Sequence, residues 1–293
     1  MTSPLGRALP TVRDRDYLLD RSGVIFKVIG EVHPNSHWLG YVKYYPDVRG
    51  DRTLFGKTYR QNTIVSRAFG ILADRPECYV YSSAIGCVIT GVPREDVVLH
   101  YSCRNALTTL HKSTDLLDGS PVSEDLLAIV DWITREGFTD VIGVTGSFLV
   151  GVAGPRSDID LVCYGPRGYE AAEALFTERS LICPYEGENL TRLYLRRARY
   201  MAGSSYDMLL RQEARKLQGL TAGAGAHINC EPLRAGRGPD VPRRGRAGGR
   251  ADQCPGRADP LERHRELPRQ PRPLTGQVGP RDDGDLSHQV AVP

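Results

Sequence analysis

The segment 140–162 constrains the fold of this chain more than any other part of it. The apolar, β-branched run Asp140–Thr145 predicts a buried strand, and the Gly146-Ser147 pair after it predicts the point where that strand ends and a short helix begins. A second apolar run, Ile159–Val162, predicts a return strand. Because the connection between them is short, we expect the two strands to lie side by side.

Two pairs of residues in this segment indicate chemistry. Residues two apart share a face of a strand, so Asp158 and Asp160 are expected to project together. Adjacent carboxylates repel each other unless a cation lies between them, and hard oxygen ligands suit Mg²⁺ or Mn²⁺. Gly146 permits close approach of a ligand to the backbone, and the helix N-terminus with the Ser147 hydroxyl offers donors to a phosphate. This combination is typical of phosphoryl or nucleotidyl transfer.

The order Gly146-Ser147, ten intervening residues, then Asp158-Ile159-Asp160 resembles the signature of the DNA polymerase β-like nucleotidyltransferase superfamily. The resemblance extends more loosely over residues 119–234. It implies an α+β fold, in which a mixed sheet with helices forms a polymerase β-like palm. It also implies an NTP substrate held by Ser147, with Asp158 and Asp160 as the catalytic metal ligands.

The same family usually has a third carboxylate, which acts as a base or as a metal ligand. The segment 226–233 alternates like a strand and places His227, Asn229 and Glu231 on one face. Glu231 is therefore the candidate third acid, although a glutamate of this kind is also common on an edge strand without any catalytic role. Its rivals are Glu186, Glu188 and Asp207.

Basic residues precede this predicted strand. Most of them are expected to be surface charges of helices, and Arg215 or Lys216 is the candidate contact to a triphosphate or an acceptor. They are Arg192, Arg196, Arg197, Arg199, Arg215 and Lys216.

The patterning predicts three parts: a strand-rich N-terminal domain at 1–118, the nucleotidyltransferase domain at 119–234, and a tail at 235–293. In the first part, β-rich runs predict strands at 23–30, 37–45, 78–81, 87–91 and 97–101, with a helix at 60–73. In the second part, apolar spacing predicts helices at 121–136, 169–176, 190–201 and 206–217.

The tail differs sharply in composition from the rest of the chain. Of its 59 residues, 34 are Gly, Ala, Pro or Arg, and it contains no Ile, Met or aromatic residue. So little apolar surface cannot offset the entropy of ordering the chain, so the tail is expected to be disordered. Three origins are open: an arginine-rich arm that touches RNA or DNA, an inert tail, or a reading-frame shift in GC-rich DNA.

Overall composition excludes several classes of protein. No apolar run approaches the roughly 20 residues of a membrane-spanning helix, and the N-terminus lacks the apolar core of a signal peptide. The seven cysteines are odd in number and form no C-x-x-C pair, which favours reduced thiols and a cytoplasmic location. The formal net charge is only +3, and its excess lies in the tail, so the body has no net positive field for nucleic acid.

The hypothesis that follows is a metal-dependent nucleotidyltransferase. It would use Mg²⁺ or Mn²⁺ and move a nucleoside monophosphate from an NTP such as ATP to an acceptor hydroxyl on a nucleic acid, a protein or a small molecule. The alternative is a catalytically degenerate nucleotide-binding or regulatory module that lacks the complete carboxylate triad. A third hypothesis is a nucleic-acid adaptor that uses the arginine-rich tail, which predicts salt-sensitive binding.

Overall fold

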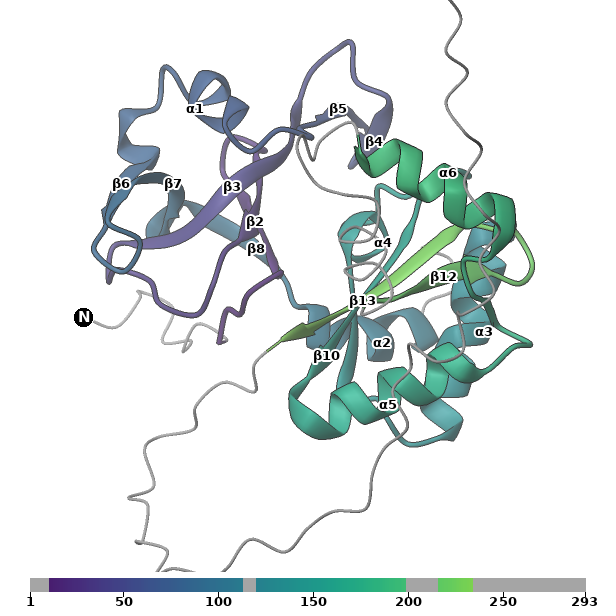
Figure 1. The fold of residues 1–293 in the computed structure, drawn as a ribbon. Helices are drawn as coiled ribbons and strands as arrows, with labels where there is room; N and C mark the ends of the chain where they lie inside the picture. Colours follow the sequence, from purple (N-terminus) through teal and green to yellow (C-terminus); the bar gives the residue numbers. More distant parts are fainter. Residues whose placement is uncertain (1–10, 113–119, 199–215, 234–293) are drawn as a thin grey trace, which may run out of the picture. The chain divides into compact units, whose positions relative to one another are not determined.

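The computed structural model describes residues 11–112, 120–198 and 216–233, which form a mixed α/β fold with two sheets (Figure 1). All of them belong to one compact unit. The boundary predicted near residue 118 and the tail predicted to be disordered both lie outside the described residues, so these two expectations stay predictions.

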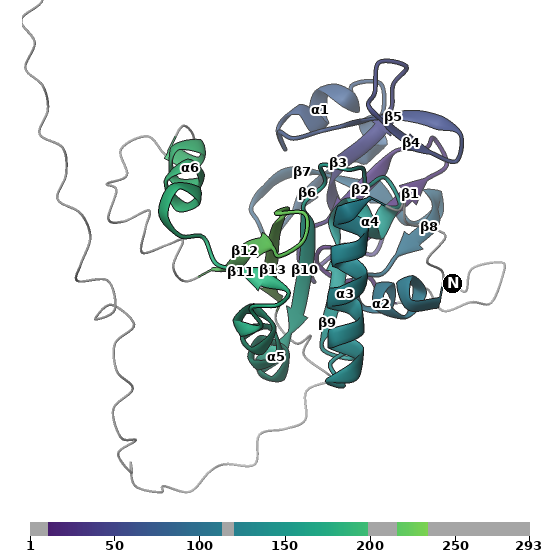
Figure 2. The same cartoon turned by 90° about the vertical axis from the view of Figure 1, so that its right-hand side faces the viewer.

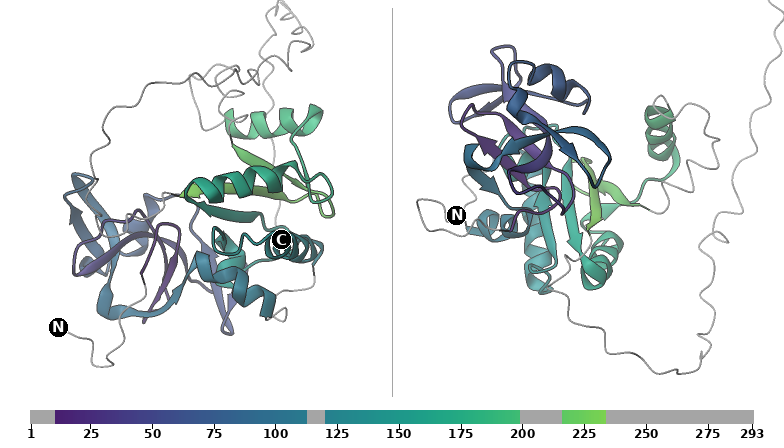
Figure 3. Two further views of the ribbon diagram at one scale, coloured as in Figure 1. Left: turned by 90° about the horizontal axis from the view of Figure 1, so that it is seen from below. Right: turned by 90° about the vertical axis from the view of Figure 1, so that its left-hand side faces the viewer.

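The strand-rich N-terminal region predicted from the sequence is confirmed, and its strands form one curved antiparallel sheet (Figure 3). Six strands follow the order β4-β5-β3-β2-β1-β8, while β7 pairs with β3 and β6 pairs with β7. The strands are β1 (Tyr17–Asp20), β2 (Ile25–Val28), β3 (His37–Pro46), β4 (Arg52–Leu54), β5 (Lys57–Gln61), β6 (Tyr79–Ser82), β7 (Cys87–Pro93) and β8 (Val97–Tyr101). Three short helices accompany them: α1 (Arg67–Ile71), η1 (Pro76–Cys78) and η2 (Arg94–Asp96).

Alternation along these strands produces two apolar faces. Phe26, Val28 and Val42 belong to one buried cluster, and Tyr17 and Tyr44 belong to another, which also contains Val150 and Val152 from the second part of the chain. Burying one large apolar side chain contributes about 1.5–3 kcal/mol. The second cluster therefore ties the N-terminal sheet to the segment that carries the Gly-Ser turn, which lies just before Val150 and Val152.

The helix predicted at 60–73 is mostly wrong. The structure has strand β5 through Gln61 and only the five-residue α1 beyond it. The cause is tertiary: β5 pairs with both β3 and β4, and the buried Asn62 donates from Nδ2 to the carbonyl of Val42 at 2.9 Å. Asn62 Oδ1 also accepts from the backbone N–H of Ile64, which turns the chain out of the strand.

The second sheet has five strands in the order β11-β12-β13-β10-β9, and its only parallel pair is β10 with β13 within the described residues. The strands are β9 (Ile142–Thr145), β10 (Ile159–Tyr164), β11 (Ile182–Cys183), β12 (Leu217–Thr221) and β13 (His227–Leu233). The helices of this region are α2 (Cys103–Lys112), α3 (Pro121–Arg135), α4 (Gly146–Val150), α5 (Gly165–Thr177) and α6 (Gly187–Ala198).

Helices α3 and α5 supply the core under one face of this sheet (Figure 2). Leu126, Ile129 and Ile133 of α3 are buried with Ile159 of β10 and Ile228 of β13. The predicted start of α3 is confirmed, because the Ser120 hydroxyl accepts from the backbone N–H of Ser123 and Pro121 occupies the first turn. With one face of the sheet covered in this way, its polar side chains project from the other face.

The predicted helix 206–217 is wrong at its C-terminal end. Residues 206–215 lie outside the described residues, and Leu217 begins strand β12. The strand forms because β12 pairs on both sides, with β11 and with β13. Gly219 permits the close approach: a Cβ there would lie 2.6 Å from the carbonyl oxygen of Cys183.

The described residues contain neither a helix suited to span a membrane nor a disulfide bond. No helix in them combines the length and the apolar character needed to cross a lipid bilayer. Their six cysteines are all free thiols, as the sequence predicts.

Candidate active site

The Gly-Ser turn lies where the sequence predicts it, at the start of α4 directly after β9. Thr145 precedes the helix in extended conformation, and Gly146 has a φ of +74°, which favours glycine. A Cβ on Gly146 would lie 2.4 Å from Oδ2 of Asp160. Glycine is therefore required both by the backbone and by the carboxylate beside it.

The Asp-x-Asp pair begins the neighbouring strand. Asp158 lies one residue before β10, and Asp160 lies within it, between Thr145 of β9 and Asn229 of β13 in the strand register. Asn229 donates from Nδ2 to Oδ1 of Asp160 at 2.6 Å. One oxygen of Asp160 is thus held by an amide while the other faces the glycine of the turn.

Asp158 has a different set of neighbours. Partial desolvation raises the pKa of its carboxyl group, the charges of His227 and Arg196 act to lower this pKa, and the Asp160 charge raises it further. His227 Nδ1 lies 2.6 Å from the hydroxyl of Tyr185. Desolvation lowers the pKa of His227, against the opposing effect of Asp158, so the imidazole is kept neutral more readily than in water.

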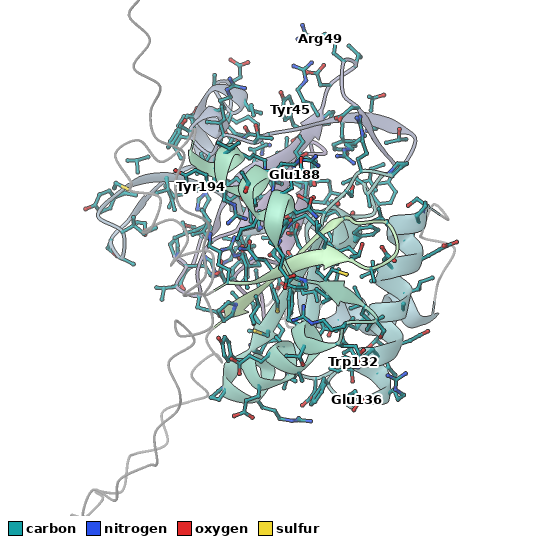
Figure 4. The ribbon with its side chains drawn as sticks, turned by 45° about the vertical axis from the view of Figure 1, so that its right-hand side comes forward. Tyr45, Arg49, Trp132, Glu136, Glu188 and Tyr194 are labelled. Atoms are coloured by element: carbon teal, nitrogen blue, oxygen red, sulfur yellow. The ribbon has the colours of Figure 1, made fainter. Side chains whose placement is uncertain are left out.

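A pocket of about 730 Å³ opens beside Asp158. Its lining includes Asp158, Tyr185, His227, Arg192 and Arg196. The two arginines come from α6, the helix on which Glu188 and Tyr194 are labelled in Figure 4. The pocket therefore joins one carboxylate of the pair to two positive charges, a lining that suits a phosphate-bearing ligand.

Glu231 lies on β13, and its strand partner is Val162 rather than Asp160. Its carboxylate forms an ion pair with the Arg15 guanidinium at 2.6 Å. The residue opposite Asp160 is Asn229, a partner that the sequence reasoning missed. Alternation correctly placed Asn229 and Glu231 on one face, but the pairing register between strands far apart in sequence decides which of them meets Asp160.

The other candidates are dispersed. Lys216 is exposed, lies one residue before β12 and is not among the residues that line the pocket. Glu188 pairs with Arg192 along the exposed surface of α6 at 2.7 Å. Asp207 and Arg215 lie outside the described residues. The catalytic role of Glu231 and the nucleotide-binding role of Lys216 stay predictions.

A long-range contact holds the loop between α4 and β10. Arg52 of β4 donates from one guanidinium nitrogen to the carbonyl of Val152 and to the hydroxyl of Ser157, both at 3.2 Å. The Ser157 hydroxyl also accepts from the N–H of Gly154 at 2.9 Å. The sequence reasoning missed Arg52 because more than 100 residues separate it from the loop.

The donor set at this edge fits a hard divalent cation. Asp158 and Asp160 are neighbouring carboxylates whose mutual repulsion a cation relieves. Within the described ranges no group of three or more His, Cys, Asp or Glu side chains is arranged to hold a metal ion. Mg²⁺ commonly takes one or two carboxylates and completes its shell with water and substrate phosphates, so two aspartates suffice.

The comparisons with known proteins agree with this geometry. The family model of the nucleotidyltransferase domain matches residues 129–214. No curated protein and no solved structure gives a significant match. The matched segment includes the Gly-Ser turn and the Asp-x-Asp strand, while β13 and the N-terminal sheet lie outside it. Residues 129–214 of this chain are therefore similar to the nucleotidyltransferase domain, in agreement with the resemblance to the polymerase β-like superfamily.

Proposed function

We propose that this protein is a metal-dependent nucleotidyltransferase that moves a nucleoside monophosphate from an NTP to an acceptor hydroxyl. One observation carries the proposal: the backbone at Gly146 is so close to the Asp160 carboxylate that a Cβ would lie 2.4 Å from it. A turn suited to phosphate and a carboxylate suited to a cation are thus in direct contact. A metal-bound triphosphate satisfies both at once.

The residues take distinct roles in this proposal. The backbone at Gly146 and the Ser147 hydroxyl bind the β- and γ-phosphates. Because α4 has only five residues, individual N–H groups rather than a large helix dipole supply the attraction. Asp158 and Asp160 hold Mg²⁺ or Mn²⁺, which when bound offsets the negative charge of the phosphates. The five-stranded sheet, with β10 between β9 and β13, serves as the polymerase β-like palm.

In the transfer, the acceptor hydroxyl oxygen forms a bond to the α-phosphorus of the NTP. The bond from that phosphorus to the bridging oxygen breaks, and pyrophosphate leaves with the electron pair. The hydroxyl proton passes to Glu231, the remaining acid on the site face of β13. The acceptor is a hydroxyl of a nucleic acid, a protein or a small molecule.

The test is transfer of label from α-³²P NTPs, each supplied with Mg²⁺, with Mn²⁺ or with a chelator, to candidate acceptors and to the protein itself. Asp158→Asn and Asp160→Asn should abolish transfer. Asp140→Asn is the matched control, because Asp140 forms an exposed ion pair with Arg167 in the same region. Metal-independent NTP binding, or turnover that survives both site substitutions, would exclude the proposal.

A second candidate function has its own supporting observation. An amide, Asn229, faces Asp160 where a third acid would complete a triad, and Glu231 is engaged by Arg15. This arrangement favours a nucleotide-binding or regulatory module. The label-transfer assay together with calorimetry separates the two functions. If the protein is the enzyme, the wild type transfers label, and Glu231→Gln loses transfer but still binds NTP. The module binds NTP with Mg²⁺ in wild type and transfers nothing.

A further inference from the structure

The turn that leads into the N-terminal sheet supplies Arg15 to the face of the second sheet that carries Asp160. The Arg15 carbonyl accepts from the Thr145 hydroxyl at 3.0 Å, while the Arg15 guanidinium pairs with Glu231 at 2.6 Å. Thr145 lies on β9 and Glu231 on β13, the two strands that flank β10. Arg15 therefore crosses over β10 on the face from which Asp160 projects.

Two lysines lie on neighbouring strands of the N-terminal sheet that follows Arg15. Lys27 of β2 pairs in register with Tyr17 of β1 on one side and with Tyr41 of β3 on the other. Its ammonium lies 5.8 Å from the centre of the Tyr17 ring. Lys43 lies two residues beyond Tyr41 on the same strand. Both lysines are half-buried.

These lysines have no acidic side chain in ion-pair contact within the described part of the chain. Desolvation lowers the pKa of each; Arg15 lowers that of Lys27 further, and Lys27 lowers that of Lys43. The charge of Asp160 acts on both pKa values in the opposite direction, and that of Glu231 does so on the pKa of Lys27. Two half-buried cations that repel each other are costly without an anion.

The Tyr17 hydroxyl adds an independent sign. Tyr17 is fully buried, and its hydroxyl has no hydrogen-bond partner within the described residues. Buried hydroxyls are nearly always bonded, so this hydroxyl, on the ring that the Lys27 ammonium faces, lacks an acceptor among the described residues.

The geometry points to a phosphate-binding site formed by Lys27 and Lys43 of the N-terminal sheet opposite Asp160. This inference rests on the proposed function, because the phosphate is that of the NTP or that of the acceptor in the proposed transfer. In both cases residues of the N-terminal sheet bind a ligand in the active site, although the family match covers none of that sheet.

The experiment uses the full chain and the variants Lys27→Gln and Lys43→Gln. Lys57→Gln is the matched control, since Lys57 is an exposed lysine of the same sheet. Calorimetry measures binding of inorganic tripolyphosphate, and of a non-hydrolysable ATP analogue with Mg²⁺. Loss of a charge-assisted bond predicts affinity at least about tenfold weaker for each site variant. Lys27→Arg should retain most of the binding, and the melting temperature of Lys27→Gln should not fall.

A second titration separates the two sources of phosphate. If the lysines hold the triphosphate, the analogue itself binds more weakly to both site variants. If they hold an acceptor phosphate, inorganic phosphate binds to the analogue-saturated wild type, and Lys27→Gln loses only that event. Site variants that match Lys57→Gln in every titration would overturn the inference.

The two proposals fail differently. If Asp160→Asn loses analogue binding while Lys27→Gln and Lys43→Gln bind every ligand normally, the nucleotidyltransferase proposal survives and the lysine site does not. If the wild type binds tripolyphosphate through the lysines but binds no nucleotide, the lysine site survives and the nucleotidyltransferase proposal does not.

Discussion

Replacement of Gly146 by alanine tests the contact on which the active site depends. The backbone at Gly146 has a φ of +74°, and a left-handed residue with a Cβ costs about 1–2 kcal/mol. The new Cβ would also lie 2.4 Å from Asp160 Oδ2 and 3.2 Å from its Cβ and Cγ. Asp160 must therefore rotate, which breaks its 2.6 Å bond from Asn229.

A hydrogen bond to a charged group is worth about 1.5–3 kcal/mol, and less where the group is partly exposed, as Asp160 is. Gly146→Ala should therefore lower the free energy of unfolding by about 2–4 kcal/mol. Gly151→Ala is the matched control. Gly151 has a φ of +79°, and its nearest neighbour to a new Cβ is Leu54 Cδ1 at 3.9 Å. Gly151→Ala should lower the free energy of unfolding only by the cost of its left-handed backbone conformation, about 1–2 kcal/mol.

Urea denaturation of both variants, alone and combined with Asp160→Ala, isolates the contact. Without the Asp160 carboxylate, Gly146→Ala should cost no more than Gly151→Ala, which gives a coupling energy of about 1–2 kcal/mol. Nucleotidyl transfer should fall sharply in Gly146→Ala, because the displaced carboxylate is the proposed metal ligand. Equal costs for the two alanine variants, or a cost at Gly146 that persists without Asp160, would refute the reasoning.

Three further predictions follow from the site. Ser147→Ala should weaken NTP binding by about 1.5–3 kcal/mol, and calorimetry that shows unchanged affinity would contradict its contact with phosphate. Arg52→Met should lower the free energy of unfolding by about 1–2 kcal/mol in urea, whereas the exposed Arg49→Met should change it little; equal effects would contradict the loop-holding role. Because folding lowers the pKa of His227, the unfolded chain binds that proton more readily and stability is lost as the pH falls below about 6.5. His227→Gln should therefore lose less of its free energy of unfolding between pH 7 and pH 5 than the wild type does, and an equal loss would contradict this reasoning. The raised pKa of Asp158 has the opposite effect, since protonation in acid removes its unfavourable charge.

The turn and the Asp-x-Asp strand could be predicted because their signals are local. Gly146 and Ser147 begin a helix directly after a strand, both of which a few residues specify, and the alternation at Ile159 sets the face from which Asp160 projects. The strand β13 was predictable on the same basis. The amide at Asn229 was not recognised as the partner of Asp160, since that pairing depends on the register of two strands whose paired residues lie 69 positions apart in the sequence.

The N-terminal region shows a second limit of local patterns. The spacing at 60–73 suits a helix, yet Tyr59 is buried in the sheet and Asn62 bonds to β3. Pairing with β3 and β4 outweighs a helical preference that amounts to only tenths of a kcal/mol per residue. Long-range pairing also explains why Arg52 was not recognised as a residue that holds the loop before Asp158.

Arg15 shows how the two sheets depend on each other. Its φ of +72° lies in the region that favours glycine, so the backbone alone would select a smaller residue. Three contacts hold it there: its carbonyl accepts from the Thr145 hydroxyl and from the Cys103 thiol, and its guanidinium pairs with Glu231. An arginine at a position that suits glycine indicates that the side chain is needed, because the strain costs about 1–2 kcal/mol. Arg15 brings a positive charge beside Glu231 and Lys27, which is the arrangement that the proposed phosphate site on this face of the N-terminal sheet requires.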